Sequence, residues 1–404
     1  MAEPGMDFDS IGAAGASFGT GKGPLVVQVV RQYLPNRGGL EDVVRNLSRQ
    51  LIAQGFRVRI VTLDRLFSSP GTVLPAREVI EGAEVVRLAW RGSSRYPLAF
   101  SVFRHLKDAD LVHVHGVDFF FDALAWGWLA HRRPLFATTH GGFFHTDAHG
   151  RIKKIWFNTV TRLSGLAYRK LICCSVSDLE LFRLIHPRRA VLVENGVDTV
   201  KFAGLERREP QRRLLTIGRF SRNKRLEWLL DVMAVLVARQ PDWRLDIAGV
   251  PSDLSESDLR GLIANRGLGD HVVVHVGAGD AHLRGLAAGA SLFLSASDYE
   301  GFGLVAVEAM SAGLLPVLNA NQAYEVLAAR HGDLVLADFS QPQATAERVE
   351  LAYQRLCAEG GELQNRLAAE AGRYSWKGVA RTHISFYATV LSKRLFPGLD
   401  REMA

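Results

Sequence analysis

Short apolar runs alternate with amphipathic segments along most of the chain. Residues 25–30 form a first apolar run, residues 40–53 carry apolar side chains at helical spacing, and residues 58–63 form a second run. A buried parallel strand gives a continuous apolar run, whereas a surface helix repeats its apolar positions about every 3.6 residues. The pattern therefore predicts a strand–helix–strand unit of the kind that builds parallel sheets.

The same alternation continues to the end of the chain. Further strands are predicted at residues 84–88, 110–116, 135–139, 171–176, 214–218, 244–249, 272–277, 290–297 and 314–318. Further helices are predicted at residues 151–170, 227–235, 257–266, 304–310 and 341–372, with a last helix after Tyr374-Ser375-Trp376. Strands that alternate with helices are typical of α/β domains.

Composition bounds the class of protein. With 404 residues, of which 48% are hydrophobic and 23% charged, the chain is long and apolar enough for two or three globular domains. Three cysteines do not make a disulfide framework, and Cys173 and Cys174 end an apolar run, which favours core positions in a reducing compartment. We find neither a signal-peptide pattern nor an apolar run long enough to span a bilayer, and we therefore expect a cytoplasmic protein.

Charge is distributed unevenly. The net charge is +7, and the excess lies in the first half of the chain, much of it in residues 151–189. The predicted helix at 151–170 has Arg151, Lys153, Lys154 and Arg169 at its ends and, near one face, Trp156, Phe157, Val160 and Leu163 or Leu166. Such a face favours an anionic membrane surface or nucleic acid as partner, and a merely solvated face and packing into the core are the alternatives.

The turn that follows the strand at 290–297 is the most informative stretch. Gly301 and Gly303 break the apolar pattern, Glu300 stands on the turn, and Glu308 lies eight residues further on. In a parallel sheet this turn lies at the edge where ligands bind, and the amides of the next helix favour an anion such as a diphosphate. Two such carboxylates can contact opposite ends of an extended ligand, although spacing alone leaves open that both are solvated surface residues.

The stretch from Glu300 through Gly-Phe-Gly to Glu308-Ala-Met resembles the Glu-x7-Glu signature of the retaining family 4 glycosyltransferases. That family has the GT-B architecture, an α/β fold of two facing Rossmann-like domains with an interdomain cleft and a C-terminal helix that crosses back. Asn195-Gly196-Val197-Asp198 is similar to the segment that marks entry to its second domain. The resemblance implies a disordered tail at 1–23, an acceptor-binding domain at 24–205, a nucleotide-sugar-binding domain at 206–375 and the returning helix at 376–404.

Two basic residues follow the predicted strand at 214–218. Gly218-Arg219-x4-Lys224 is in register with the family's diphosphate-binding Arg and Lys, although Arg225 replaces the usual glycine. An Arg fork and a Lys point charge suit a diphosphate. From the residues alone, a solvated basic loop is the alternative, because Arg222 and Arg225 show that charge is common here.

His140 follows a buried-looking strand and precedes two glycines, so it should be exposed at the ligand edge. A lone histidine is more often a satisfied core residue, but the match to the family's Thr-x-His-Gly pattern implies a place near the C6 hydroxyl of the transferred sugar. Gly38-Gly39-Leu40-Glu41 resembles the loop after the family's first strand, which faces the donor diphosphate and the acceptor.

The resemblance implies catalytic roles for His140, Arg219, Lys224 and Glu300. It implies that Glu300 holds sugar hydroxyls and Glu308 the ribose, within a donor-binding set of Gly38, Gly39, Arg219, Lys224, Gly277, Glu300, Gly301, Phe302, Gly303, Leu304 and Glu308. No cofactor and no metal ion are expected, because Arg219, Lys224 and helix-start amides can stabilise the departing diphosphate. Asp108-Ala109-Asp110 mimics a metal-binding Asp-x-Asp motif, but it precedes its strand instead of following it.

The segment from His140 to His145 is similar to that of mannosyltransferases that extend polyprenyl-diphosphate-linked cellobiose in bacterial exopolysaccharide assembly. This implies transfer of α-mannose from GDP-mannose, with retention, by an enzyme held peripherally at the inner face of the cell membrane, without a nucleic-acid partner. The loop at 319–322 departs from the family's small, glycine-rich segment, so UDP-glucose, UDP-galactose and UDP-N-acetylglucosamine stay open as donors. A sugar-nucleotide epimerase on the same fold and a nucleic-acid-binding protein are the other classes.

Overall fold

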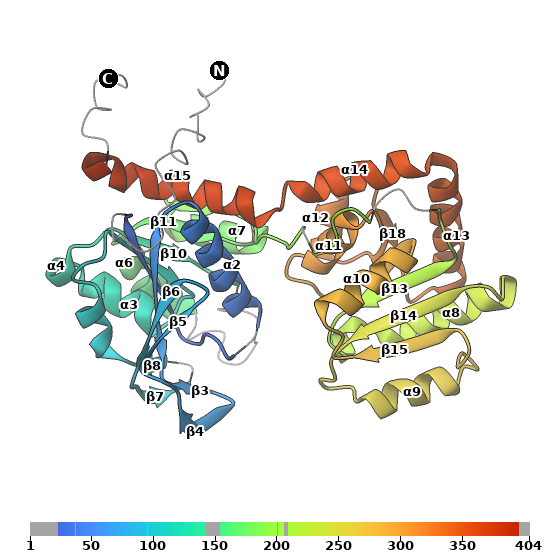
Figure 1. The fold of residues 1–404 in the computed structure, drawn as a ribbon, viewed down its shortest axis with the longest axis horizontal. Coiled ribbons are helices and arrows are strands. Elements are labelled where there is room, and N and C mark those ends of the chain that lie inside the picture. The colour runs from blue at the N-terminus through green and yellow to red at the C-terminus, as the bar shows by residue number, and fades with distance from the viewer. Residues whose placement is uncertain are drawn as a thin grey trace, which may run out of the picture. The chain divides into compact units, whose positions relative to one another are not determined.

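The chain divides into two compact units in the computed structural model, which describes residues 23–36, 38–94, 96–141, 154–199, 201–205 and 209–395. The first unit combines residues 1–195 with residues 376–404, and the second unit holds residues 196–375 (Figure 1). The predicted tail, apart from Gly23, lies outside the described residues, as do His145, Arg151, Lys153 and the end of the predicted last helix.

The first unit is built on an eight-stranded sheet with the order β12-β11-β10-β9-β1-β2-β6-β5. Neighbouring strands are parallel except β5 and β6. The strands are β1 (Leu25–Val30), β2 (Arg57–Leu63), β5 (Arg77–Ile80), β6 (Ala83–Leu88), β9 (Leu111–His115), β10 (Leu135–Thr138), β11 (Tyr168–Cys173) and β12 (Ala190–Leu192). The strands predicted between residues 25 and 139 are confirmed, because both faces of this sheet are covered and its strands therefore keep a continuous apolar run.

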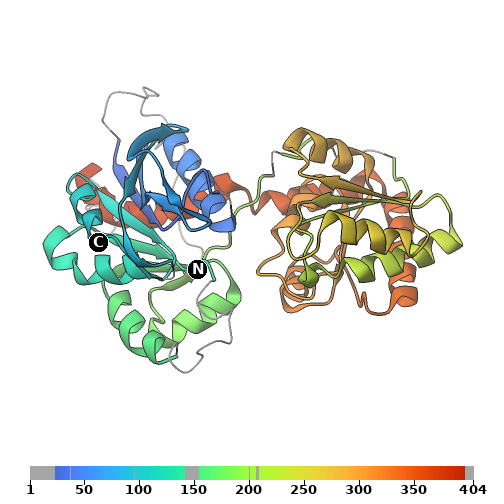
Figure 2. The ribbon, with the colours of Figure 1, turned by 90° about the horizontal axis from the view of Figure 1, so that it is seen from below.

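Helices cover both faces of this sheet. On one face α2 (Gly39–Ala53) and α15 (Trp376–Leu395) pack on the strands, and Val26, Leu47 and Tyr387 share a buried cluster. Figures 1 and 2 show α15, in red, lying along the first unit. On the other face lie α3 (Phe119–Trp126), a helical segment at 154–165 and α7 (Val176–Ile185), whose apolar side chains form a second cluster with the strands.

Short exposed elements complete the first unit. Two antiparallel strand pairs are formed by β3 (Arg65–Leu66) with β4 (Ser69–Val73) and by β7 (Arg91–Ser93) with β8 (Tyr96–Leu98). A 3-10 helix, η1 (Phe100–His105), and a one-turn helix, α4 (Trp128–His131), also belong to this unit. The sequence pattern did not predict them, because elements this short present no full period of apolar positions.

The predicted helix at 151–170 is too long. The helical segment ends at Gly165, and after a turn at residues 166–167 the chain enters β11, so Arg169 lies on a strand. The hydroxyl of Tyr168, the first residue of this strand, donates to the Phe121 carbonyl at 2.8 Å. The predicted strand at 171–176 is correspondingly wrong at its end, because Ser175 accepts from the Asp178 amide and begins α7.

The second unit is built on a six-stranded parallel sheet with the order β15-β14-β13-β16-β17-β18. Its strands are β13 (Arg213–Ile217), β14 (Arg244–Gly249), β15 (Val272–Val276), β16 (Leu292–Ser295), β17 (Leu315–Asn319) and β18 (Val335–Ala337). Its helices are η3 (Arg222–Lys224), α8 (Leu226–Arg239), α9 (Glu256–Ala264), α10 (Asp280–Gly289), α11 (Leu304–Ser311), α12 (Gln322–Arg330), α13 (Pro342–Glu359) and α14 (Gly361–Gly372). One buried apolar cluster joins the sheet and these helices.

Two features of this unit differ from the sequence-based expectation. The helical stretch at 341–372 is two helices, because the chain turns at Gly360 with φ of 54°. The chain enters the second unit between Asn195 and Gly196, before the predicted boundary at 205, since the Val197 amide already donates to the Tyr374 carbonyl at 2.8 Å. Among the described helices of both units, none is long and apolar enough to cross a membrane.

Candidate active site

The turn between β16 and α11 carries a carboxylate that faces a lysine. Glu300 stands on this turn, and its Oε1 lies 2.5 Å from Lys224 Nζ, which comes from the loop between β13 and α8. Both side chains are partly exposed. The predicted phosphate-binding cation and the predicted sugar-binding carboxylate therefore meet at the carboxyl ends of two adjacent strands.

Tyr324 on α12 contacts the carboxylate of this pair. Its hydroxyl is 3.3 Å from Glu300 Oε1 and 2.9 Å from Ser295 Oγ, at the end of β16. Burial, and then the nearby Glu300 charge, raise the pKa of Tyr324 above its usual range, so the phenol stays a proton donor. This residue could not be predicted from the sequence, because nothing in its spacing relates α12 to the turn before α11.

Gly303 is required by the geometry of the same turn. Its φ is 84°, in the left-handed region, and it is the N-cap of α11. A Cβ placed there would lie 2.6 Å from Tyr324 Cε1, too close for any side chain. Gly301 has no such neighbour, since a Cβ there would meet nothing within 4 Å.

The other predicted residues of the turn and of α11 differ in what they present. The ring of Phe302 packs on Tyr374, with centroids 5.4 Å apart, so its side chain belongs to the core of the unit. Leu304 is half-buried as the first residue of α11, and Glu308 is half-buried one turn further along the helix.

The loops after β13, β14 and β15 lie side by side. The Gly218 amide donates to the Ala248 carbonyl at 2.9 Å, and the Gly277 amide donates to the Gly249 carbonyl at 2.8 Å. The side chain of Arg219 is exposed on the first of these loops. Arg219 and Gly277 are thereby placed at the same edge of the sheet as Lys224 and Glu300.

Arg225, which replaces the glycine usual in the family, adopts the conformation that a glycine would favour. Its φ is 45° and its ψ 46°, and it is the N-cap of α8. Its guanidinium forms an ion pair with Asp298 and lies 4.8 Å from the Trp228 ring centroid. The side chain thus clamps the β13–α8 loop to the end of the β16 segment.

Two asparagines of the unusual loop at 319–322 have structural contacts. Asn319 Nδ2 and Asn321 Nδ2 both donate to the Ser297 carbonyl, at 3.2 and 2.8 Å. Asn321 Oδ1 also accepts from the Tyr324 amide at 3.0 Å and so caps α12. The loop therefore fixes both the turn before Glu300 and the helix that carries Tyr324.

In the first unit, Gly38 and Gly39 begin α2. Gly38 is the N-cap, and no side chain caps the helix there. Glu41 is buried and folds back over the loop, where its Oε1 accepts from Asn36 Nδ2 at 2.7 Å. A Cβ on Gly38 would lie 2.7 Å from Glu41 Oε2. The two glycines and His140 stand at the same edge of the sheet, where β1 and β10 end.

His140 lies at the end of a chain of hydrogen bonds. Gln28 Nε2 contacts Ser48 Oγ at 2.8 Å, and Gln28 Oε1 accepts from His115 Nε2 at 2.6 Å. A neutral imidazole has one N–H, so His115 Nδ1 is an acceptor and receives the Nε2–H of His140 at 3.0 Å. Because these hydrogen bonds put the proton of His140 on Nε2, its Nδ1 is left as an acceptor.

Burial keeps these imidazoles neutral. It lowers the pKa of His140 to about 3, with a smaller contribution from His383, and lowers the pKa of His115 well below its usual range. The backbone of His140 is left-handed, with φ of 53°. Asp178 holds the turn at residues 139–141, because its Oδ2 accepts from Thr139 Oγ1 at 2.5 Å and from the Gly141 amide at 2.9 Å. His140 is therefore a fixed, uncharged group, and neither His115 nor Asp178 was predicted from the sequence.

The described residues contain no group of three or more His, Cys, Asp or Glu side chains arranged to hold a metal ion.

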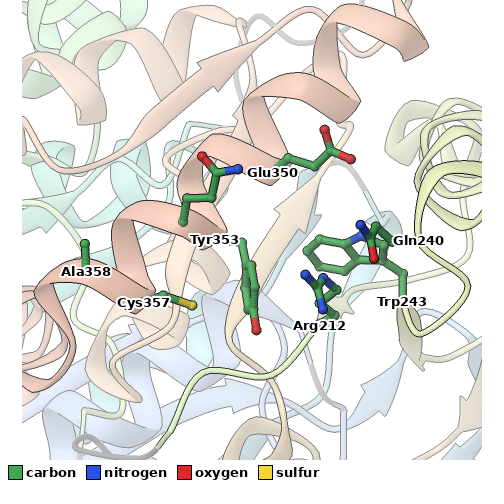
Figure 3. Close-up of a pocket in the computed structure, with 8 residues that line it drawn as sticks. Arg212, Gln240, Trp243, Glu350, Tyr353, Cys357 and Ala358 are labelled. Carbon is green, nitrogen blue, oxygen red and sulfur yellow. The ribbon is translucent and has the colours of Figure 1, made fainter.

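One hollow in the structure lies apart from the candidate site. Figure 3 shows a hollow on the second unit lined by Arg212, Gln240, Trp243, Glu350, Tyr353, Gln354, Cys357 and Ala358. The Trp243 and Tyr353 rings stand 5.4 Å apart there, with the Arg212 guanidinium 5.2 Å from the Tyr353 ring. None of the predicted site residues lines this hollow.

Comparisons with solved structures show the fold. Sucrose-phosphate synthase from Thermosynechococcus elongatus is 20% identical, covers 92% of this chain and 100% of its own, and superposes with a TM-score of 0.65. The HepE protein of Anabaena in complex with UDP is 16% identical, covers 91% of this chain and 100% of its own, and has a TM-score of 0.69. The fold is GT-B, as predicted.

Comparisons of sequence show the family. The profile described as Glycosyltransferase Family 4 matches residues 37–201, and that described as Glycosyl transferases group 1 matches residues 198–372. The GDP-mannose:cellobiosyl-diphosphopolyprenol alpha-mannosyltransferase of Komagataeibacter xylinus is 43% identical over 92% of this chain and 94% of its own length. The protein of the same name from Xanthomonas campestris is 43% identical over 91% of this chain and 97% of its own. With both units matched in order and relatives of this identity aligned along nearly the whole length, the chain belongs to the family 4 glycosyltransferases.

Proposed function

We propose that this enzyme transfers an α-mannosyl residue from GDP-mannose to a cellobiose unit carried on polyprenyl diphosphate, with retention of configuration. The observation that carries the proposal is the 43% identity over 92% of the chain to a relative with that donor and acceptor in its name. The acceptor places the reaction in the assembly of a bacterial exopolysaccharide. Because this acceptor is a membrane lipid, the enzyme works at the inner face of the cell membrane, to which it binds peripherally.

The reaction exchanges one bond to the sugar's anomeric carbon for another. A hydroxyl oxygen of the acceptor forms a bond to C1 of mannose, the bond between C1 and the phosphate oxygen breaks, and GDP leaves with that electron pair. The departing phosphate takes the proton of the acceptor hydroxyl. The group that needs stabilisation is thus the phosphate, on which negative charge grows as the bond breaks.

The contact between Lys224 and Glu300 supports this chemistry. In a nucleotide-sugar, the phosphate and the sugar are joined through a single oxygen, so a cation for one and a carboxylate for the other must stand close together. Lys224 Nζ and Glu300 Oε1 are 2.5 Å apart. Lys224 binds the diphosphate together with Arg219, and Glu300 accepts hydrogen bonds from the sugar hydroxyls. No metal ion is required for this charge stabilisation.

The remaining residues orient the donor. Glu308 on α11 holds the ribose hydroxyls, and the amides of the 301–304 turn bind phosphate oxygens at the start of that helix. Gly38, Gly39 and Gly277 allow backbone to approach the donor without a side chain between them. His140 accepts a hydrogen bond from a sugar hydroxyl through Nδ1, the nitrogen that its own hydrogen bond to His115 leaves unprotonated.

The test is a transfer assay with purified enzyme and polyprenyl-diphosphate-linked cellobiose. GDP-mannose, UDP-glucose, UDP-galactose and UDP-N-acetylglucosamine are supplied separately, with and without EDTA. We expect mannosyl transfer from GDP-mannose that EDTA does not reduce and a product with the α linkage by NMR. Transfer from a UDP-sugar alone would overturn the donor, loss with EDTA would overturn the metal-independent chemistry, and epimerised nucleotide-sugar without transfer would overturn the reaction itself.

A further inference from the structure

One side of the first unit exposes an unusual number of large apolar side chains. Among the described residues, all three exposed tryptophans are there, on α3, on α4 and at the start of the 154–165 helix. The most exposed members are Trp126 (64%), Leu129 (75%), Ile155 (65%), Leu163 (65%) and Leu166 (57%). Exposing side chains of this size to water is unfavourable, so a contiguous group of them indicates a surface that is covered during function.

The elements that carry these side chains are packed against one another. Asp122 on α3 joins them, because its Oδ1 accepts from Ser164 Oγ of the 154–165 helix at 2.7 Å and its Oδ2 accepts from the Tyr96 hydroxyl of β8 at 2.9 Å. The Tyr96 ring also contacts Trp156, with centroids 6.0 Å apart. Figure 1 shows α3, α4 and α6 (Arg162–Gly165) as neighbours on one side of the first unit.

The η1 segment and α4 belong to the same group. Phe100, 64% exposed, lies with its ring centroid 5.1 Å from that of Phe119 at the start of α3. The Phe103 ring stacks on His131 at 6.2 Å, and His131 Nε2 contacts the Leu124 carbonyl at 2.8 Å. We call this apolar group, with the cations described next, the interfacial surface.

The charge on these elements has one sign. Residues 96–107, 119–135 and 154–169 are described, and their exposed charged side chains are Arg104, Lys107, Arg132, Lys154, Arg162 and Arg169. The exposed carboxylate of Asp108, directly after the first stretch, is paired with Arg59. The single carboxylate within these three stretches is Asp122, which is buried and hydrogen-bonded. Apolar side chains surrounded by cations suit the boundary between acyl chains and anionic headgroups.

We propose that the interfacial surface of the first unit docks the enzyme on an anionic lipid bilayer, with Trp126, Trp128, Leu129, Ile155 and Leu163 entering the headgroup boundary. Tryptophan is the residue that favours this boundary most, and lysine and arginine beside it bind the anionic headgroups. The proposal deepens the proposed function, because a lipid-linked acceptor lies in such a bilayer. It rests on that function only for its purpose, since bilayer binding is measured without donor or acceptor.

The test measures sedimentation of the full chain with vesicles of phosphatidylcholine alone and vesicles that also contain phosphatidylglycerol. We expect binding to the anionic vesicles, weakened by added salt, and little binding to the neutral ones. The double variant Leu129→Ser/Leu163→Ser should partition about tenfold less well, because two apolar side chains leave the membrane boundary. The double variant Lys154→Gln/Arg162→Gln should lose most of its preference for the anionic vesicles.

A matched control changes exposed apolar residues of the second unit. Val273→Ser/Leu351→Ser removes side chains that are 50% and 57% exposed, and it should bind vesicles as the unaltered enzyme does. Trp126→Phe should keep binding while reducing the blue shift of tryptophan emission that vesicles cause. Circular dichroism confirms that each variant is folded, which is expected for substitutions of exposed residues.

Three outcomes would overturn the inference. Equal vesicle binding by Leu129→Ser/Leu163→Ser and the unaltered enzyme would show that this surface does not meet the bilayer. An equal loss of vesicle binding in the control variant Val273→Ser/Leu351→Ser would show that any exposed apolar substitution weakens binding. A dimer in sedimentation equilibrium that the Leu129→Ser/Leu163→Ser variant abolishes, with no vesicle binding, would assign the surface to a second copy of the chain. Vesicle binding without mannosyl transfer would leave this inference standing and remove the proposed function.

Discussion

Lys224 is the residue on which the proposed chemistry depends most directly. Its ammonium lies 2.5 Å from Glu300 Oε1, and in the proposed reaction negative charge develops on the phosphate bound beside it. Preorganised charge of this kind acts in the transition state more than in the ground state.

We therefore expect Lys224→Ala to lower kcat about a hundredfold to a thousandfold, as the loss of a contact to developing negative charge does. Arg222→Ala is the matched control, because Arg222 is an exposed cation two residues earlier on the same loop. Steady-state rates of the two variants decide the matter. Near-normal turnover by Lys224→Ala would remove the diphosphate assignment, and an equal loss in Arg222→Ala would point to the loop as a whole.

His140 owes its proton arrangement to His115. If the hydrogen-bond chain through Gln28 sets the tautomer, His140 carries its proton on Nε2 and does not titrate between pH 5 and 8, because burial lowers its pKa to about 3. Imidazole ¹⁵N NMR should show this tautomer in the unaltered enzyme. His115→Leu should lose this tautomer of His140 together with activity. His115→Asn places an amide oxygen near the position of His115 Nδ1, the acceptor for His140, and should retain the tautomer. The same His140 tautomer in His115→Leu would contradict the assignment.

At the scale of elements, the turn between β16 and α11 combines two constraints. Gly303 needs a left-handed backbone, and Tyr324 from α12 leaves no room for a Cβ. The turn thereby holds Glu300 at the end of a buried strand, and the constraint comes from an element that follows later in the sequence.

Gly303→Ala should lower the free energy of unfolding by about 1–3 kcal/mol, since it forces a Cβ into the left-handed region and against the Tyr324 ring. Gly301→Ala is the control, because its Cβ meets nothing within 4 Å and its φ is not positive. Urea denaturation of the two variants gives the comparison. A Gly303→Ala enzyme as stable as Gly301→Ala would mean that the turn relaxes freely.

The sequence predicted elements best where one period dominated. The buried run of β1 and the helical spacing after Gly303 were identified with their bounds nearly correct. The helix at 151–170 was extended too far, because the alternation of Leu166 to Lys170 fits a helix end as well as the start of β11. The helix α7 was missed although Ser175 and Asp178 form an N-cap, since the apolar run before it read as strand.

The candidate site was predictable only in part for a related reason. Lys224 and Glu300 could be predicted to lie at one edge of the sheet, because each follows a strand and matches a family motif, and the structure brings them into contact. Tyr324, His115 and Gln28 were not, because their roles arise from contacts between elements that no local period reports.

At the scale of the whole molecule, buried imidazoles set how stability depends on pH. Burial lowers the pKa values of His113 and His115 well below the usual range and that of His383 to about 4. Histidines titrate near pH 6.5 in the unfolded chain. Below about pH 6.5 the unfolded chain therefore binds protons that the folded chain does not, so the stability present above that pH is lost as pH falls.

Asp118 acts in the opposite sense. Burial raises its pKa to about 6, so the stability that this carboxyl contributes is present below about pH 3.8 and is lost as pH rises through 6. The three buried imidazoles together have a larger effect on the free energy of unfolding than this single carboxyl. We expect the free energy of unfolding to rise from pH 5 to pH 7 by about 1–2 kcal/mol for each buried imidazole, less about 1 kcal/mol for Asp118.

Urea denaturation at several pH values checks this expectation. His383→Gln removes one of the buried imidazoles, so its pH dependence should be shallower than that of the unaltered enzyme. A free energy of unfolding that does not change between pH 5 and 7, or an unchanged slope in the variant, would contradict the burial of these groups as neutral imidazoles.

The return of α15 to the first unit imposes an order on the making of the protein. During synthesis β1 emerges from the ribosome well before α15, the helix that helps to cover it, and residues 196–375 emerge between them as one uninterrupted segment. Domains fold as units during synthesis, so the second unit can complete its core while the first still lacks Ile384 and Tyr387. Until α15 emerges, the part of this sheet face that α2 does not cover is thus open, the kind of apolar surface that chaperones shield. The first unit therefore completes its core only after the whole second unit has emerged.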